Sequence, residues 1–93
     1  MIIIPEREIA GLVSPADCLI AVERVFASMA NKSAYNFPVV REAIGHAEAL
    51  YGFKSGFDRE KLLLGLKSGG FWPNNVQHGL SNHQSTIFLF DAD

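Results

Sequence analysis

One short pattern, Gly-x-Lys-Ser-Gly, occurs twice in neighbouring stretches of this chain, at residues 52–56 and 65–69. Both copies lie in segments rich in apolar residues, and the mostly polar residues 57–60 between them are typical of a hairpin loop. The pattern therefore predicts two antiparallel strands over residues 48–55 and 61–68. In this pairing Gly56 lies opposite Lys61, and Leu50 lies opposite Lys67.

The two faces of this hairpin differ in chemistry, because side chains alternate between faces along a strand. Lys54 and Lys67 share one face with glycines, and in this register they stand roughly 13 Å apart at the strand rise, so they do not form a like-charge pair. Glycine within a strand often marks the close approach of a ligand, so we expect the floor of a cavity with an ammonium at each end. The other face is expected to be the core under a helix, and carries Ala49, Tyr51, Phe53, Leu62, Leu64 and Leu66.

Exposed lysines and turn glycines are also common on ordinary surfaces, and that plainer interpretation suits the hairpin taken alone. Two further features favour a binding site. Lys67 is followed by Gly69 and Gly70, whose backbone amides can approach an anion closely. The aromatic, proline-containing segment 71–75 comes next. Such a site suits a carboxylate or a phosphate.

The first third of the chain predicts helices. Pro5 suits the start of a brief helical turn that runs to Leu12. Ser14 and Pro15 suit the N-cap and first turn of a longer helix, to which Asp17 adds negative charge. Apolar residues then recur at three- and four-residue steps, which indicates an amphipathic helix of about four turns that ends at residues 31–33; these residues are Cys18, Leu19, Val22, Val25, Phe26 and Met29.

Further strands are indicated at residues 1–4, 37–44 and 83–90, with a polar loop at residues 74–82. The expected order is β-α-β-β-β-β. The expected fold class is α+β, with one main amphipathic helix packed on a mostly antiparallel sheet.

Composition narrows the class of protein. The 93 residues fit one domain, and a net charge of −2 gives no reason to expect a nucleic-acid partner. Cys18 is the single cysteine, which fits a reducing compartment. The N-terminus lacks the basic start of a signal peptide, and no apolar stretch approaches the ~20 residues of a membrane span. We expect a soluble, cytoplasmic protein with no membrane partner.

Metal and hydrolase sites find little support. The histidines His46, His78 and His83 are scattered, with no i,i+4 pair and no cysteine cluster nearby. Ser85 lies close to His83 but not in a G-x-S-x-G elbow. We therefore expect neither a bound metal nor a hydrolase.

Four motifs in a fixed order carry a family resemblance: Pro38-Val-Val-Arg41, Gly65-Leu-Lys67, Pro73-x-Asn75 and Gly79-Leu80. Together they resemble the ornithine cyclodeaminase/mu-crystallin family, which includes ketimine reductases and an alanine dehydrogenase branch. The resemblance covers essentially the whole chain. It implies that the 93 residues are a single domain, the truncated N-terminal substrate-binding and dimerisation part of a longer two-domain enzyme. The end of the sequence just after a predicted strand agrees with this expectation.

The resemblance also implies a cofactor and partners. Family members use NAD(H) or NADP(H), which a Rossmann domain further along the chain binds. No G-x-G-x-x-G occurs here, so we expect this segment to bind no cofactor and to be inactive alone. The expected substrate is a small amino acid or imino acid, handled by cyclodeaminase or ketimine reductase chemistry. The expected assembly is a homodimer formed through the sheet.

The resemblance assigns the substrate site to four side chains. Arg41 is expected to bind the substrate carboxylate, which suits a guanidinium fork. Lys67 is expected to contact the same region and is the candidate for proton transfer. Asn82 falls near a position where the family contacts substrate with a threonine. Lys54 replaces an often apolar position, which suggests a substrate other than ornithine, with a second acidic group.

Plainer alternatives remain for the same residues. Without the family, Arg41 is more simply a surface residue paired with Glu42 or Glu48, and Lys67 is equally well a solvent-exposed lysine. The whole chain also fits a stand-alone α+β module, in which Lys54 and Lys67 bind an acidic metabolite or a protein partner.

Overall fold

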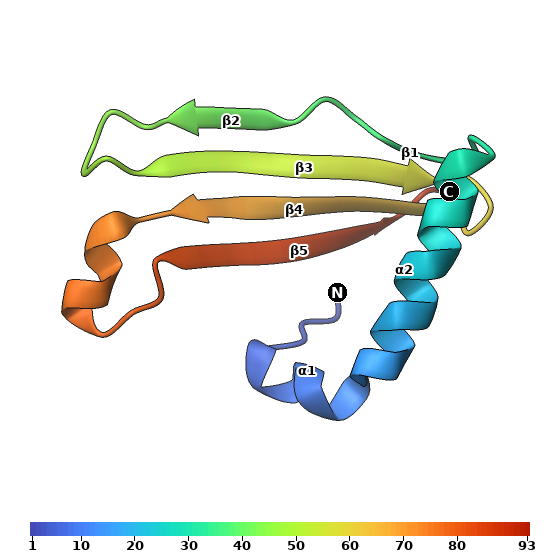
Figure 1. Ribbon diagram of the computed structural model, residues 1–93, viewed down its shortest axis with the longest axis horizontal. Coiled ribbons are helices and arrows are strands. Elements are labelled where there is room, and N and C mark those ends of the chain that lie inside the picture. The colour runs from blue at the N-terminus through green and yellow to red at the C-terminus, as the bar shows by residue number, and fades with distance from the viewer.

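The computed structural model describes every residue from Met1 to Asp93. Two helices come first and a five-stranded sheet follows, so the predicted α+β class with one main helix and a mostly antiparallel sheet is confirmed (Figure 1). The elements are α1 (Glu6–Leu12), α2 (Pro15–Ala30), β1 (Ala34–Asn36), β2 (Val40–Ala43), β3 (Leu50–Asp58), β4 (Leu63–Phe71), the 3-10 helix η1 (Pro73–His78) and β5 (His83–Asp91).

Helix α2 begins where the sequence predicts. The Ser14 hydroxyl accepts a hydrogen bond from the Asp17 backbone N–H at 3.1 Å, and the Asp17 carboxylate accepts one from the Ser14 N–H at 2.9 Å. This reciprocal capping box satisfies two N–H groups that the helix leaves unpaired. At the other end Lys32 adopts a left-handed φ of 66°, and the Ser33 N–H donates to the Ser28 carbonyl at 2.9 Å, which closes the helix.

Two strand predictions outside the hairpin differ from the structure. Residues 1–4 form no strand, because this apolar run has no neighbouring strand with which to pair. The N-terminus lies beyond β5, on the side where α1 and α2 lie (Figure 1). The predicted strand over residues 37–44 is shorter and is preceded by a separate strand, β1. Pro38 lies between β1 and β2 and has no N–H to donate to a ladder, which explains the interruption.

All strand pairs in the sheet are antiparallel, in the order β1-β3-β4-β5, and β2 also pairs with β3. Strands β1 and β2 pair with successive parts of β3, at Asn36 opposite Gly56 and at Val40 opposite Phe53. The long strands β3, β4 and β5 therefore form the body of the sheet (Figure 1).

The register of the β3–β4 hairpin differs from the predicted one by four residues, since Gly56 lies opposite Gly65 and not Lys61. The turn comes later than predicted because of Asp58. Its carboxylate accepts hydrogen bonds from the backbone N–H groups of Glu60 and Lys61 at 3.0 and 3.1 Å. Such a side-chain turn fixes the start of the loop at Asp58. The shift is even, so the residues that lie within both the predicted and the observed strands keep their faces. Ala49 and Leu62, predicted on the core face, lie outside β3 and β4.

The two faces of the sheet are chemically distinct. We call the first the lysine face; it carries Arg41, Leu50, Gly52, Lys54, Gly56, Gly65, Lys67, Gly69, Phe71, His83, Ser85, Ile87 and Leu89. The second, the apolar face, carries Tyr35, Val40, Phe53, Phe57, Leu64, Leu66, Phe88 and Phe90.

Helix α2 leaves the apolar face largely uncovered, whereas the sequence predicts that the helix lies on that face. Its residues Val25 and Met29 line a shallow hollow with residues of both faces, namely Gly65, Lys67 and Leu89 of the lysine face and Tyr35, Phe57 and Leu66 of the apolar face. No large side chain is fully buried, and Tyr35, Phe88 and Phe90 of the apolar face are each more than 40% exposed. The radius of gyration is 15.7 Å, against about 12 Å for a compact domain of this length. The apolar face is therefore available to be covered by other protein.

No helix of the chain is long and apolar enough to cross a membrane.

Candidate functional site

A hollow of about 240 Å³ lies over the middle of the lysine face. Polar residues of four strands line it, among them Arg41 of β2, Lys54 of β3, Lys67 of β4, and His83 with Ser85 of β5. The glycines Gly52 and Gly69 also line it. The structure thus brings together three of the four predicted site residues, from segments far apart in the sequence.

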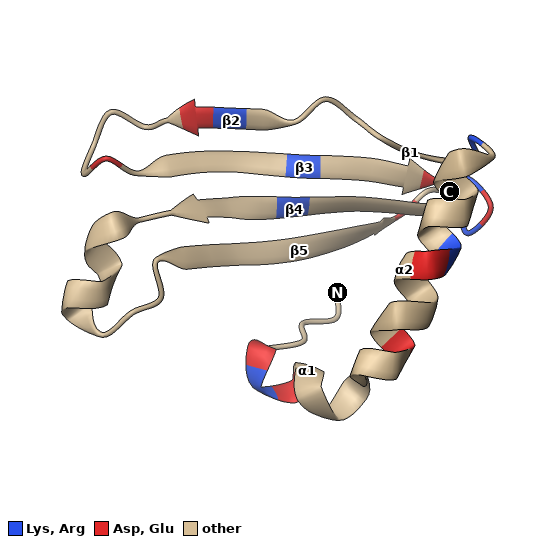
Figure 2. Cartoon of the chain, viewed as in Figure 1, with Lys and Arg blue, Asp and Glu red and all other residues tan.

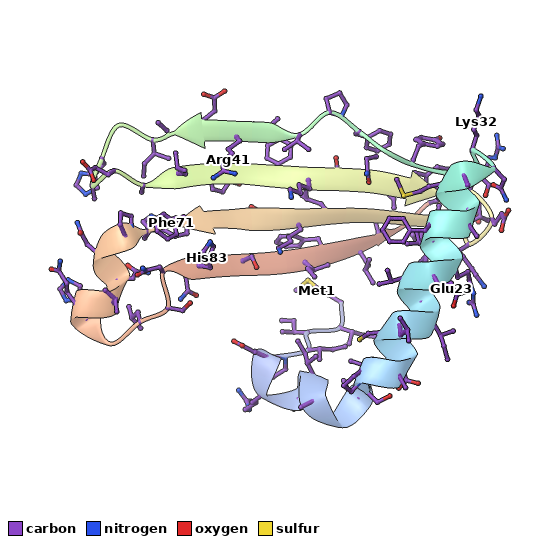
Figure 3. The ribbon with its side chains drawn as sticks, in the orientation of Figure 1. Met1, Glu23, Lys32, Arg41, Phe71 and His83 are labelled. Carbon is purple, nitrogen blue, oxygen red and sulfur yellow. The ribbon has the colours of Figure 1, made fainter.

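The sheet register places these residues in rows. Arg41, Gly52, Gly69 and Ser85 stand side by side across β2, β3, β4 and β5. Lys54 and Lys67 form the next row, so Arg41 and Lys67 are two strands and two residues apart, ~12 Å between Cα atoms. Figure 3 shows the Arg41 side chain extending from β2 over β3, on the same side of the sheet as Phe71 and His83. Long side chains can meet over the two glycines.

Gly52 and Gly69 cannot be replaced by larger residues without a steric clash. A Cβ on Gly69 would collide with the Gln84 carbonyl oxygen and lie 2.6 Å from the Ser85 Cα. A Cβ on Gly52 would likewise collide with the Val40 carbonyl oxygen. Neighbouring backbone therefore approaches too closely for any side chain, and the space above the strands stays open to a ligand.

Lys54 and Lys67 face each other directly as register partners on β3 and β4. The prediction that they stand far apart is wrong, and the cause is the later turn at Asp58. Directly opposed residues have Cβ atoms ~5 Å apart, so both lysine side chains extend from one part of the floor of the hollow.

No acidic side chain lines the hollow. Figure 2 shows the basic positions of β2, β3 and β4 grouped in the middle of the sheet, with acidic positions nearer the strand ends. Glu42 pairs with Tyr51, whose side chain is on the other face, so Glu42 is not placed to neutralise Arg41. The three cations are therefore arranged for an anion that comes from outside the sheet.

His83 also lines the hollow, whereas the sequence favours an ordinary residue at the start of a strand over one that borders the site. Its ring lies 5.0 Å from the Phe71 ring, and the two residues are register partners. The sequence offered only its position at the start of a strand, and its place beside Phe71 depends on how the intervening loop closes.

Asn82 lies outside the hollow. Its side-chain oxygen accepts a hydrogen bond from the Val76 N–H at 3.1 Å, and its carbonyl accepts one from the Trp72 N–H at 2.8 Å. These bonds close the loop around η1, so Asn82 positions that loop; a substrate contact from Asn82 stays a prediction.

No protein-family model matches the chain. Over all of its 93 residues the chain is 66% identical to the iminosuccinate reductase of Paracoccus denitrificans (strain Pd 1222), of which it covers 29%. The chain resembles part of a reductase. The crystal structure of the iminosuccinate reductase of Paracoccus denitrificans in complex with NAD+ is 68% identical, with a TM-score of 0.91 over 95% of this chain and 27% of that one. The chain thus spans less than a third of the relatives that it matches.

Proposed function

We propose that this chain is the substrate-binding and dimerisation part of a longer NAD- or NADP-dependent reductase of the ornithine cyclodeaminase/mu-crystallin family. The high identity to a segment of an iminosuccinate reductase supports the reductase class. It favours reduction of an open-chain imino acid over cyclodeamination of ornithine, and it makes iminosuccinate the first substrate to test.

One observation carries the proposal: Arg41 and Lys67 line one hollow, over a glycine floor, with no acidic side chain beside them. Arg41 binds the substrate carboxylate with its planar fork of donors, which matches the two oxygens. Lys67 lies near the reacting imine and moves a proton at its nitrogen. Both side chains are exposed in this chain, so a substrate can reach them.

The residues of this chain do not fit a dinucleotide. The sheet is antiparallel and the sequence has no G-x-G-x-x-G, whereas a dinucleotide fingerprint needs a strand, a glycine-rich turn and a helix. In the proposed enzyme a nicotinamide bound elsewhere supplies the hydride. The 93 residues alone then lack catalytic activity.

The second candidate is a stand-alone module that binds an acidic metabolite or an acidic protein segment. The same cationic hollow favours it, since an anion site needs no cofactor. The two candidates differ in one respect: the module binds its anion without any nicotinamide-dependent turnover.

The test uses the full-length protein that carries this chain, with oxaloacetate plus ammonia as the source of imine. Nicotinamide absorbance reports turnover. We expect Arg41→Ala to raise the KM for the imino acid roughly 10- to 100-fold, because a charge-assisted hydrogen bond is lost. The Kd for NADH should change less than about twofold on the same scale.

Arg59→Ala is the matched control, since Arg59 lies exposed in the hairpin loop outside the hollow. It should leave both constants unchanged. Equal loss of imino-acid and nicotinamide binding in Arg41→Ala would contradict the role given to Arg41. Absence of turnover with every imine tested would favour the module.

A further inference from the structure

The hollow holds more positive charge than one carboxylate can balance. Arg41, Lys54 and Lys67 line it together and no aspartate or glutamate does. An α-imino acid with an apolar side chain brings one carboxylate, which leaves two cations unpaired. Like charges held together without a counter-ion repel each other, so the arrangement favours a ligand with a second anionic group.

The position of Lys54 suits it to bind the second anionic group of the ligand. Arg41 pairs with Gly52, and Lys54 is two residues further along β3, so Lys54 is the diagonal neighbour of Arg41 on the same face. Diagonal neighbours in a sheet have Cα atoms ~7–8 Å apart. A four-carbon dicarboxylate can therefore lie with one end on Arg41 and the other on Lys54, above the glycine floor.

We propose that Lys54 is the specificity-determining residue of the site: its ammonium binds the distal carboxylate of a dicarboxylic imino acid. Lys67, directly opposite Lys54, is then left to act on the imine end of the same ligand. This inference rests on the proposed function for the imine, but the preference for two carboxylates over one is independent of turnover.

The test compares wild type, Lys54→Met and Lys61→Met in the full-length protein. Methionine keeps much of the lysine stem and removes the charge. Lys61 is exposed in the hairpin loop and lies outside the hollow, so its variant makes the same charge change elsewhere. With NADH, kcat/KM is measured for oxaloacetate plus ammonia and for pyruvate plus ammonia.

For Lys54→Met we expect the dicarboxylate kcat/KM to fall about 10- to 100-fold, and the pyruvate kcat/KM to stay equal or rise. Lys61→Met should match wild type for both. Equal loss for both substrates in Lys54→Met overturns the inference while leaving the reductase intact. If His83→Asn removes the preference and Lys54→Met does not, the distal carboxylate lies at His83 and the inference is again overturned.

Calorimetric binding of unreactive succinate and butyrate separates the two proposals. Wild type should bind succinate more tightly than butyrate, and Lys54→Met should bind both alike. That result supports the inference even if no imine is reduced. Equal binding of both acids by wild type counts against it, whatever the turnover.

Discussion

Lys54 and Lys67 stand directly opposite each other on β3 and β4, and the pairs Gly52–Gly69 and Gly56–Gly65 flank them on the same face. The repeated Gly-x-Lys-Ser-Gly pattern thus pairs with itself in reverse, lysine to lysine and glycine to glycine. Two cations are set side by side on β3 and β4, with only glycines next to them along these two strands on this face. This arrangement suits an anionic ligand and offers the sheet itself no stabilisation.

Lys67 is predicted to transfer a proton, whereas Arg41 is predicted only to bind the substrate. Substitution of Lys67 by arginine tests whether proton transfer, and not charge alone, is required. Lys67→Arg keeps the charge but cannot release a proton at neutral pH. We expect kcat for the imino acid to fall roughly 100-fold or more, as for loss of general acid–base catalysis, with a small change in KM. Steady-state kinetics on the full-length protein measure both.

Lys67→Met should lower kcat as well and should also raise KM. An arginine variant with normal kcat would show that Lys67 serves only as a charge. Lys61→Arg, in the hairpin loop, is the control for the chemical change itself.

Gly69 is predicted to be required by packing. A Cβ there meets the Gln84 and Ser85 backbone of β5, so Gly69→Ala must push β4 and β5 apart. We expect a loss of about 2 kcal/mol or more in the free energy of unfolding, typical of overpacking. Urea denaturation of the full-length protein measures it.

Gly65→Ala is the matched control in the same strand, because its Cβ would meet the Leu89 side chain at 3.5 Å and the Phe88 carbonyl oxygen at 3.9 Å, which are ordinary contacts. It should cost less than about 1 kcal/mol. Similar costs at both positions would show that the loss comes from glycine replacement in general and not from the close approach at Gly69.

Structural features that depend on neighbouring residues are predicted correctly from the sequence. Features that depend on contacts between distant residues are not. The start of α2 follows from Ser14, Pro15 and Asp17 alone, and it is correct. The hairpin register depends on which residue starts the turn, and the predicted loop at residues 57–60 begins before Asp58, whose hydrogen bonds start the observed one. Residues 1–4 are apolar enough for a strand, but nothing in the sequence shows that no other strand lies beside them.

The candidate site was predictable in part for the same reason. The two-residue period places Lys54 and Lys67 on one face whatever the even shift in register. Their direct opposition, and the place of His83 beside Phe71, depend on the two loops. The loop before β5 is closed by hydrogen bonds that Asn82 accepts from Trp72 and Val76, and no local sequence pattern predicts them.

The capping box gives α2 a pH-dependent contribution. The Ser14 backbone N–H, and next the Ser14 hydroxyl, hold the pKa of Asp17 below its usual 3.8. A carboxyl with a lowered folded-state pKa adds stability above the unfolded pKa, and this is lost as pH falls through the folded value. Wild type should therefore be more stable than Asp17→Asn from pH 5 to 7, and the difference should shrink below about pH 4.

Urea denaturation of both full-length proteins at several pH values checks this. In a Ser14→Ala background only the backbone N–H remains to contact the carboxylate, so the pH-dependent part should become smaller without disappearing. A difference between wild type and Asp17→Asn that is the same at pH 3 and pH 7 would contradict the assignment.

The exposed apolar face is predicted to form the homodimer. Tyr35 and Phe57 pack edge to face on it, with ring centroids 6.1 Å apart, and Phe88 and Phe90 extend it across β5. Burying a carboxylate there without a partner is costly, so Phe88→Asp should raise the dimer Kd at least ~30-fold, as for a hot-spot residue. Light scattering coupled to size-exclusion chromatography on the full-length protein measures the mass.

Val76→Asp is the control, since Val76 is 66% exposed on η1, away from this face. A Phe88→Asp protein that keeps the wild-type mass over dilution would place the dimer interface elsewhere, and a monomeric wild type would remove the dimer altogether.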